Sequence, residues 1–277
     1  MELLKALILG IIQGLTEFLP VSSSGHIELG KALLDFDLGE NNLLFTVLLH
    51  CATVLSTMIV FRKDIVQIVK GLFKFKWNEE TAFAFMIILS MIPVVLVGLL
   101  LEEQVESFFS GRIMFVGFML WVTATLLFLT KFAAQNQSKQ PESDNSNGLT
   151  GKKVGFKDAL IIGIAQAIAV LPGISRSGST IATGLLLGVD KSRIARFSFL
   201  MVLPPILGAT ILEFMEFDSA TIGQIEFMPL VVGFLGAFIS GWIACIWMIN
   251  IVKKGKLIYF AIYCFIIGAI AIGAQFI

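Results

Sequence analysis

Charge is scarce in this chain of 277 residues: only 14% are Asp, Glu, Lys or Arg, whereas 57% are hydrophobic. Soluble domains carry about 25% charged residues, so the composition excludes an ordinary soluble domain and indicates a protein embedded in lipid. Acidic and basic residues balance to a formal net charge of zero. We therefore expect no nucleic acid partner, because the chain has no excess of positive charge to attract a phosphate backbone.

Cysteine is also scarce. Cys51, Cys245 and Cys264 lie within apolar runs, and their spacing fits neither a metal site nor a disulfide framework. We expect them to be small buried hydrophobic residues. The N-terminus lacks a basic segment followed by a small-residue cleavage site, so we expect the first apolar run to belong to the mature protein.

Long apolar runs, by contrast, are abundant. A transmembrane helix needs about 20 predominantly apolar residues. Six segments meet this requirement and are predicted to span the membrane: 42–61, 81–101, 113–132, 195–213, 228–252 and 257–276.

Two further apolar segments, 3–34 and 158–188, are interrupted midway by proline, glycine and hydroxyl residues. Each half is too short to cross a bilayer alone. A broken helix at membrane depth is tolerated only where it packs within protein or lines a cavity. Both segments are therefore predicted to form re-entrant helix–loop–helix hairpins, although a single such loop would more simply be a kinked helix.

The two hairpins resemble each other in sequence. Residues 6–13 match 159–166, Leu19-Pro20 matches Leu171-Pro172, and Ser22-Ser23-Ser24-Gly25 matches Ser175-Arg176-Ser177-Gly178. Three predicted spans follow each hairpin. The chain is thus predicted to consist of two repeats, 1–132 and 158–277, joined by a flexible polar linker, 133–157.

The distribution of charge predicts the orientation. Most basic residues lie in the segments 62–76, 131–157, 191–196 and 253–256, whereas acidic residues dominate the alternate loops. The basic loops are expected on the cytoplasmic side. The first hairpin then enters from outside and the second from inside, so the repeats are inverted, an architecture in which ligands bind where broken helices meet.

Few residues at this meeting point are costly in lipid, and such residues are functional-site hypotheses by default. Gln13 and Glu17 share one face of the first half-helix, because they are four residues apart. His26 lies on the returning half-helix of the first hairpin, and Arg176 lies in the second loop, just before a half-helix. A helix N-terminus favours anions, and arginine binds phosphate bidentately.

This set of residues predicts chemistry as well as binding. A serine hydroxyl could attack phosphorus if Glu17 or His26 took its proton, while Arg176 neutralised the phosphoryl oxygens. Glu17 could also hold a divalent cation through phosphate oxygens. The simpler interpretations are that Ser22–Ser24 cap a helix, that His50 makes an interhelical hydrogen bond, and that Glu28 points to another face.

Two motifs, residues 13–26 (QGLTEFLPVSSSGH) and 172–180 (PGISRSGST), resemble the signature motifs of the undecaprenyl-diphosphate phosphatase family, the bacitracin-resistance proteins. The resemblance covers essentially the whole chain. It implies hydrolysis of undecaprenyl diphosphate to undecaprenyl phosphate and inorganic phosphate, usually with Mg²⁺ or Ca²⁺, in recycling of the lipid carrier for cell-wall synthesis. It also implies a multi-pass protein of the bacterial cytoplasmic membrane with an outward-opening active site; a homodimer is compatible with this.

The same resemblance implies roles for individual residues. The catalytic residues are expected to be Glu17, Ser23, His26 and Arg176. The phosphate-binding residues are expected to be Ser22, Ser24, Gly25, Gly173, Ser175, Ser177, Gly178 and Thr180. The first acidic-or-amide position of the family is Gln13 here, so a metal would be held by Glu17 and Gln13 rather than by two carboxylates.

Two alternatives remain at this stage. Inverted repeats with opposed hairpins also occur in transporters, so a lipid-carrier flippase or secondary transporter is one alternative. A lipid-phosphate binding protein without turnover is another. The co-occurrence of Ser23, Glu17, His26 and Arg176 favours an enzyme, because transport needs neither a nucleophile nor a base. The sequence leaves open whether Ser23 or an activated water attacks phosphorus.

Overall fold

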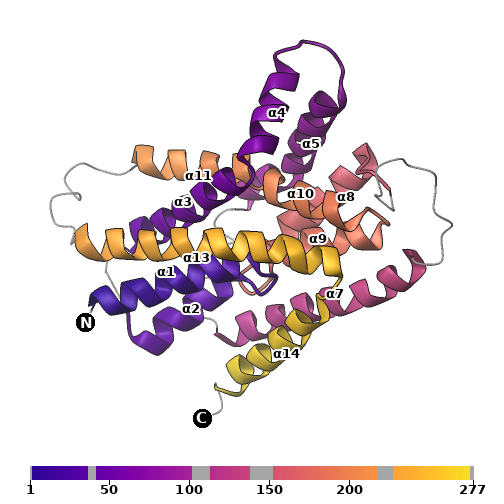
Figure 1. Ribbon diagram of the computed structural model, residues 1–277. Coiled ribbons are helices and arrows are strands. Elements are labelled where there is room, and N and C mark those ends of the chain that lie inside the picture. The colour runs from indigo at the N-terminus through magenta and orange to yellow at the C-terminus, as the bar shows by residue number, and fades with distance from the viewer. Residues whose placement is uncertain (1, 37–41, 102–112, 138–151, 217–226, 275–277) are drawn as a thin grey trace.

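The fold is entirely helical in the computed structural model, which describes residues 2–36, 42–101, 113–137, 152–216 and 227–274 (Figure 1). The helices are α1 (Glu2–Phe18), α2 (Ser23–Leu34), α3 (Asn42–Val60), α4 (Arg62–Leu72), α5 (Glu79–Leu100), α7 (Ile113–Gln137), α8 (Phe156–Ile168), α9 (Arg176–Leu186), α10 (Lys191–Met201), α11 (Leu203–Glu216), α13 (Phe227–Lys254) and α14 (Ile258–Gly273). No strand forms among these residues; one isolated bridge pairs Lys152 with Val189.

Within the described residues, four stretches are long and apolar enough to cross a membrane: α5, residues 113–132 of α7, residues 191–212 across α10 and α11, and α13. The expected span 42–61 corresponds to α3, which bends by 76° into α4 and makes a fifth candidate if the pair counts as one. The last expected span corresponds to α14, which is apolar but only 16 residues long. The protein is therefore a helical, multi-pass membrane protein.

Several basic segments that we expected to be loops are helical instead. The segment 62–80 contains α4, whose Ile65 and Ile68 pack against the core at the three-residue spacing of a helix face. The basic residues of 191–196 lie in the first turns of α10, which begins early because Asp190 accepts hydrogen bonds from the N–H groups of Ser192 and Arg193, at 2.9 and 3.0 Å. Most of the expected flexible linker, residues 138–151, lies outside the described residues.

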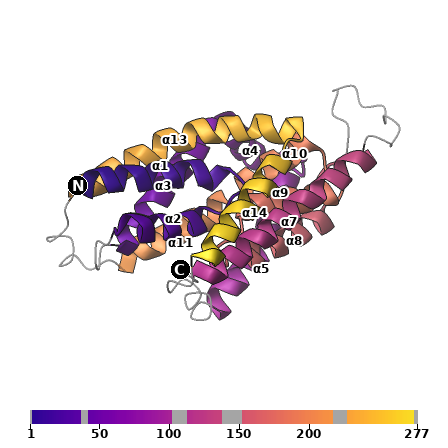
Figure 2. The same cartoon turned by 90° about the horizontal axis from the view of Figure 1, so that it is seen from below.

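The broken segments contain a helix pair each, α1–α2 and α8–α9, and the breaks fall at the loops of Pro20 and Pro172. Each first helix packs on a helix from the other half of the chain: α1 lies along α13, and α8 contacts α5 (Figures 1 and 2). A Cβ on Gly10 of α1 would overlap the carbonyl oxygen of Gly233, and one on Gly163 of α8 would overlap that of Ser90. Small residues thus allow the same close backbone approach in both pairs.

Candidate active site

The two loops between the helix pairs share the same cap hydrogen bond. Ser22 caps α2 by accepting a hydrogen bond from the N–H of Gly25 at 3.3 Å, and Ser175 caps α9 by accepting one from Gly178 at 3.1 Å. A Ser-x-x-Gly cap satisfies an N–H group that the first turn of a helix leaves free. Ser22 has a φ of 70°, which a residue with a side chain rarely adopts. Conformational strain of this kind concentrates at functional sites.

The loops also contact each other. The hydroxyl of Ser177 donates to the carbonyl oxygen of Leu19 at 3.3 Å. A Cβ on Gly25 would lie 3.2 Å from the Cα of Gly173, so only residues without a side chain fit this approach without adjustment. Gly173 also has a φ of +97°, in the left-handed region that favours glycine. The glycines of both motifs therefore allow the two helix N-termini to approach closely.

Glu17 lies at the centre of the hydrogen bonds between the loops. Its Oε2 accepts from the Ser23 hydroxyl at 2.8 Å and from the Gln13 amide at 3.0 Å, and its Oε1 is ion-paired with Arg176. Glu17 is only 8% exposed, whereas the Arg176 side chain is 27% exposed. A buried carboxylate needs a cation and hydrogen bonds to stay charged. Arg176 supplies the cation from the second loop.

A cavity of about 360 Å³ lies beside this network. Its polar lining comes from both hairpin segments, from α3 and from α11, namely Gln13, Ser23, Ser24, Glu28, Thr46, His50, Gln166, Arg176 and Thr210. The rest of the wall is mainly apolar, namely Ile27, Val47, Val94, Ala169, Val170, Ile174, Val202, Pro205, Ile206 and Ala209. Such a cavity suits a ligand with a charged head and an apolar chain.

The remaining expected phosphate-binding residues have different surroundings. Ser22 and Ser175 are buried by their capping role. The hydroxyl of Thr180 lies 2.6 Å from that of Ser198 and donates to the carbonyl of Arg176 at 2.9 Å. Ser177 and Glu17 line a small adjacent cavity. In this arrangement Ser22, Ser175 and Thr180 hold the shape of the loops, while Ser23, Ser24 and Arg176 face the main cavity.

The ring nitrogens of His26 are hydrogen-bonded to groups other than Glu17 and Ser23. Its Nδ1 lies 2.8 Å from the carbonyl oxygen of Ser22, and its Nε2 lies 2.9 Å from the hydroxyl of Tyr263 on α14. The carbonyl can only accept, so Nδ1 carries the proton and Nε2 accepts from Tyr263. The two rings stack at 5.6 Å between centroids. In this arrangement His26 ties the first loop to α14.

Three residues at the cavity were not among the sequence-based candidates. The Nε2 of His50 lies 4.0 Å from the Oε2 of Glu17. The Nδ1 of His50 is hydrogen-bonded within α3 to the carbonyl oxygen of Thr46 at 2.9 Å. Glu28 lines the cavity rather than pointing away from it. Gln166, from α8, lines it as well. The repeat contains a signal for Gln166, because it is aligned with Gln13.

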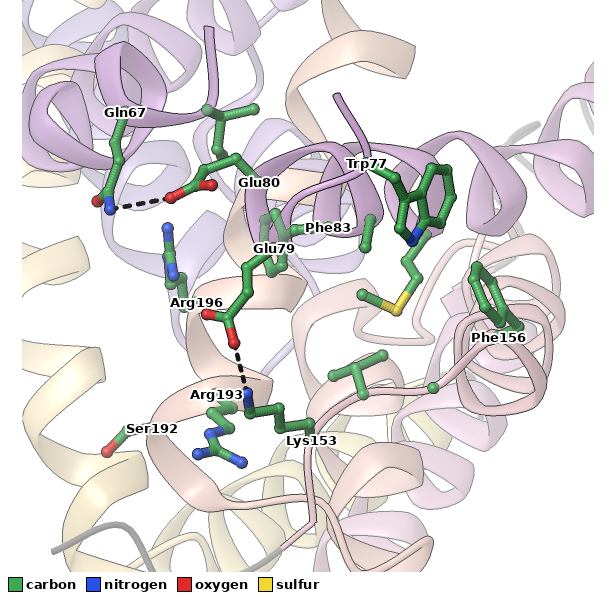
Figure 3. A pocket seen from close by; sticks show the side chains of 15 residues that line it. Gln67, Trp77, Glu79, Glu80, Phe83, Lys153, Phe156, Ser192, Arg193 and Arg196 are labelled. Atoms are coloured by element: carbon green, nitrogen blue, oxygen red, sulfur yellow. Dashed lines mark hydrogen bonds and ion pairs between the residues drawn. The ribbon is translucent and has the colours of Figure 1, made fainter. Parts of the chain in front are cut away.

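A larger cavity, about 650 Å³, lies elsewhere, between α4, α5 and the starts of α8 and α10 (Figure 3). Two of its cations are ion-paired: Lys153 is 2.7 Å from Glu79 in the same lining, and Arg196 is 2.7 Å from Asp64 of α4, outside the lining. None of the candidate site residues lines it. Since the candidate residues line the smaller cavity between the two loops instead, that cavity is the better candidate for the active site.

The donor atoms beside Ser23 fit a divalent cation that is shared with a phosphate. No group of three His, Cys, Asp or Glu side chains suited to a metal occurs within the described part of the chain. Glu17 offers a carboxylate, and the Oε1 of Gln13 is buried without a hydrogen-bond partner among the described residues. Mg²⁺ is usually bound by one or two carboxylates together with substrate phosphates. Glu17 and Gln13 are the residues that would hold such a cation.

Comparison with known proteins finds a family and close relatives. The family model of the bacitracin resistance protein BacA matches residues 6–270. A protein of Christiangramia forsetii named undecaprenyl-diphosphatase is 56% identical over 273 residues, 98% of each chain. Proteins of the same name from Bacteroides thetaiotaomicron and Methanobrevibacter smithii are 52% identical (99% of this chain, 100% of that one) and 38% identical (98% and 96%).

Proposed function

This chain belongs to the family of the bacitracin resistance protein BacA, and we infer from this membership and from its site that it is an undecaprenyl-diphosphatase. It removes the terminal phosphate of undecaprenyl diphosphate, which returns the lipid carrier to cell-wall synthesis and confers bacitracin resistance. The observation that carries this function is the contact between Ser23, Glu17 and Arg176, which joins the two loops beside a cavity with a mainly apolar wall.

Ser23 is the proposed nucleophile and Glu17 its base. The Ser23 oxygen attacks the terminal phosphorus while Glu17 takes the serine proton, and the bond from phosphorus to the bridging oxygen breaks, so that undecaprenyl phosphate leaves. A water then hydrolyses the phosphoserine to inorganic phosphate. The 2.8 Å hydrogen bond from Ser23 to Glu17 supports this assignment over His26, whose ring nitrogens are bonded elsewhere. Direct attack by a water that Glu17 activates is the competing route.

Arg176 links substrate binding to the release of this base. In the structure its guanidinium is ion-paired with Glu17, which keeps the carboxylate a weak proton acceptor. A diphosphate carries more negative charge than one carboxylate and accepts two parallel hydrogen bonds from a guanidinium. When Arg176 turns to the diphosphate, Oε1 of Glu17 loses its partner, so that one carboxylate oxygen can take the serine proton while the other contacts the cation. The free N–H groups at the starts of α2 and α9 add further positive potential.

We propose that a divalent cation, Mg²⁺ or Ca²⁺, is held by Glu17 and Gln13 together with the substrate. When bound it supplies positive charge to the diphosphate oxygens and eases departure of the leaving phosphate. The protein's own residues remain responsible for the attack and for moving the serine proton.

The proposed setting is the bacterial cytoplasmic membrane, with six spans (α3, α5, α7, α10–α11, α13 and α14) and two re-entrant hairpins (α1–α2 and α8–α9) in inverted repeats. Matching caps and matching glycine contacts in the two halves support the repeat. Basic residues at α4 and α10 support a cytoplasmic location for those ends, with the active site opening outward. Cysteines introduced at Lys70 and Asp35 of a cysteine-free protein should react with impermeant reagents from opposite sides; labelling from one side contradicts the topology.

Phosphate release by purified protein in detergent tests the function. The wild-type protein should release phosphate from undecaprenyl diphosphate, and Arg176→Ala should lower the rate by about 10³-fold or more, as loss of a cation at a phosphoryl group does. Arg62→Ala, which removes an exposed arginine of α4, is the matched control and should be unchanged. Binding of the diphosphate without any release by the wild-type protein would instead support a carrier or flippase.

A further inference from the structure

Gln166 is a buried amide with nothing to bind. Its side chain is 2% exposed, and neither its Nε2 nor its Oε1 has a hydrogen-bond partner within the described part of the chain. Buried polar groups are nearly always paired, because an unpaired donor or acceptor lowers the stability of the fold. An orphaned amide at a cavity therefore points to a partner that arrives with a ligand.

The cavity that Gln166 lines is the one beside Ser23 and Arg176. Gln13, its counterpart in the aligned repeat, lines the same cavity from α1 and is fully buried. The two glutamines differ in their bonding, because the Nε2 of Gln13 donates to Glu17 at 3.0 Å whereas both polar atoms of Gln166 are free. The repeat thus supplies one glutamine that contacts the base and a second that is available to a ligand.

The chemistry of the substrate matches the free donor. Phosphate oxygens are acceptors, and Gln166 contributes two N–H donors without adding charge. Glu28 lines this wall as well, and it is 3.7 Å from Lys31. Arg176 and Gln166 are two of the side chains here that can donate to a diphosphate, together with hydroxyl groups and the imidazole of His50.

We propose that Gln166 binds the substrate directly, with its side-chain N–H groups donating to a non-bridging phosphate oxygen of the diphosphate while Arg176 holds another. This assignment rests on the diphosphatase function proposed above. Gln166 is then a substrate-binding residue contributed by the second repeat, and the first repeat supplies the nucleophile and base. The unpaired amide lowers the stability of the substrate-free protein, and the bound diphosphate gives this amide a hydrogen-bond partner.

The test is Gln166→Met, which keeps the length and volume of the side chain but removes its donors. Steady-state release of phosphate from farnesyl diphosphate should show kcat/KM lowered about ten- to hundredfold, the usual effect of losing a hydrogen bond to a charged group. The melting temperature should stay the same or rise, because a buried unpaired amide has been removed. Gln166→Glu should be more damaging, since its charge repels phosphate.

Gln67→Met is the matched control: this exposed glutamine of α4 bonds to Glu80 at 3.3 Å, and its replacement should leave turnover unchanged. Turnover of Gln166→Met within threefold of wild type would overturn the proposal. A melting temperature of Gln166→Met far below that of wild type would also overturn it, because Gln166 would then have a structural role. Rescue of Gln166→Met by excess Mg²⁺ would make Gln166 a cation ligand and likewise overturn it. An inactive wild-type protein would refute the diphosphatase function itself, a distinct result.

Discussion

Replacement of Glu17 by glutamine tests the role of this carboxylate most sharply. The change preserves size and leaves an amide oxygen that can still accept from the Ser23 hydroxyl, which lies 2.8 Å from Glu17 Oε2. It removes the negative charge that pairs with Arg176 and the capacity to take a proton. Substrate binding and chemistry should therefore respond in opposite directions.

The expected magnitudes follow from these contacts. A general base contributes roughly 10²- to 10⁴-fold to a rate, so kcat should fall by about that factor. Breaking a buried ion pair by removing one partner costs about 3–5 kcal/mol, and less is expected here because the Arg176 side chain is 27% exposed. The melting temperature should therefore drop by several degrees. Arg176, freed of its carboxylate, should bind a diphosphate more tightly.

The assay combines kinetics with ligand-induced thermal stabilisation. Glu17→Gln should show a collapsed kcat with farnesyl diphosphate. In EDTA, where no cation joins the ligand to Glu17, it should also show a larger rise of melting temperature with inorganic pyrophosphate than wild type. A kcat within tenfold of wild type would refute Glu17 as the base. Weaker stabilisation by pyrophosphate would refute the competition between Glu17 and substrate for Arg176.

The remaining predictions concern the helix contacts and the cation. Gly10→Ala and Gly163→Ala should each lower the melting temperature by several degrees, because the added methyl group overlaps the backbone of α13 or α5. The control Gly98→Ala should leave the melting temperature unchanged, because the space around its Cβ is open. Equal melting temperatures for all three variants would contradict the proposed helix packing. Chelation by EDTA should abolish phosphate release, and added Mg²⁺ or Ca²⁺ should restore it. Full activity in EDTA would show that catalysis does not require a divalent cation.

Local sequence patterns were sufficient to predict where the helices break and which residues meet on one helix. Pro20 and Pro172 cannot continue a helix, and both breaks occur at their loops. Gln13 and Glu17 are four residues apart, and their side chains are hydrogen-bonded. The meeting of the two loops followed from the repeat and the charge pattern, and Arg176 does contact Glu17.

Long-range contacts were harder to predict, because spacing carries no information about them. His50 is a lone histidine on an apolar helix, so nothing in its neighbourhood indicated that α3 brings it near Glu17. The partner of His26 is Tyr263, 237 residues later in the chain, and its position depends on how α14 packs. Basic residues at 62–80 suggested a loop, whereas the apolar spacing of α4 made it a helix.

The central claim is that the two loops form one active site, and a double-mutant cycle on Glu17 and Arg176 tests it directly. Phosphate release from undecaprenyl diphosphate should be compared for wild type, Glu17→Gln, Arg176→Ala and the double variant. Because the two side chains act as a pair across the loops, the double variant should be about as slow as the slower single variant. Losses that multiply would show that the residues act independently, and would contradict a site built jointly by the two loops.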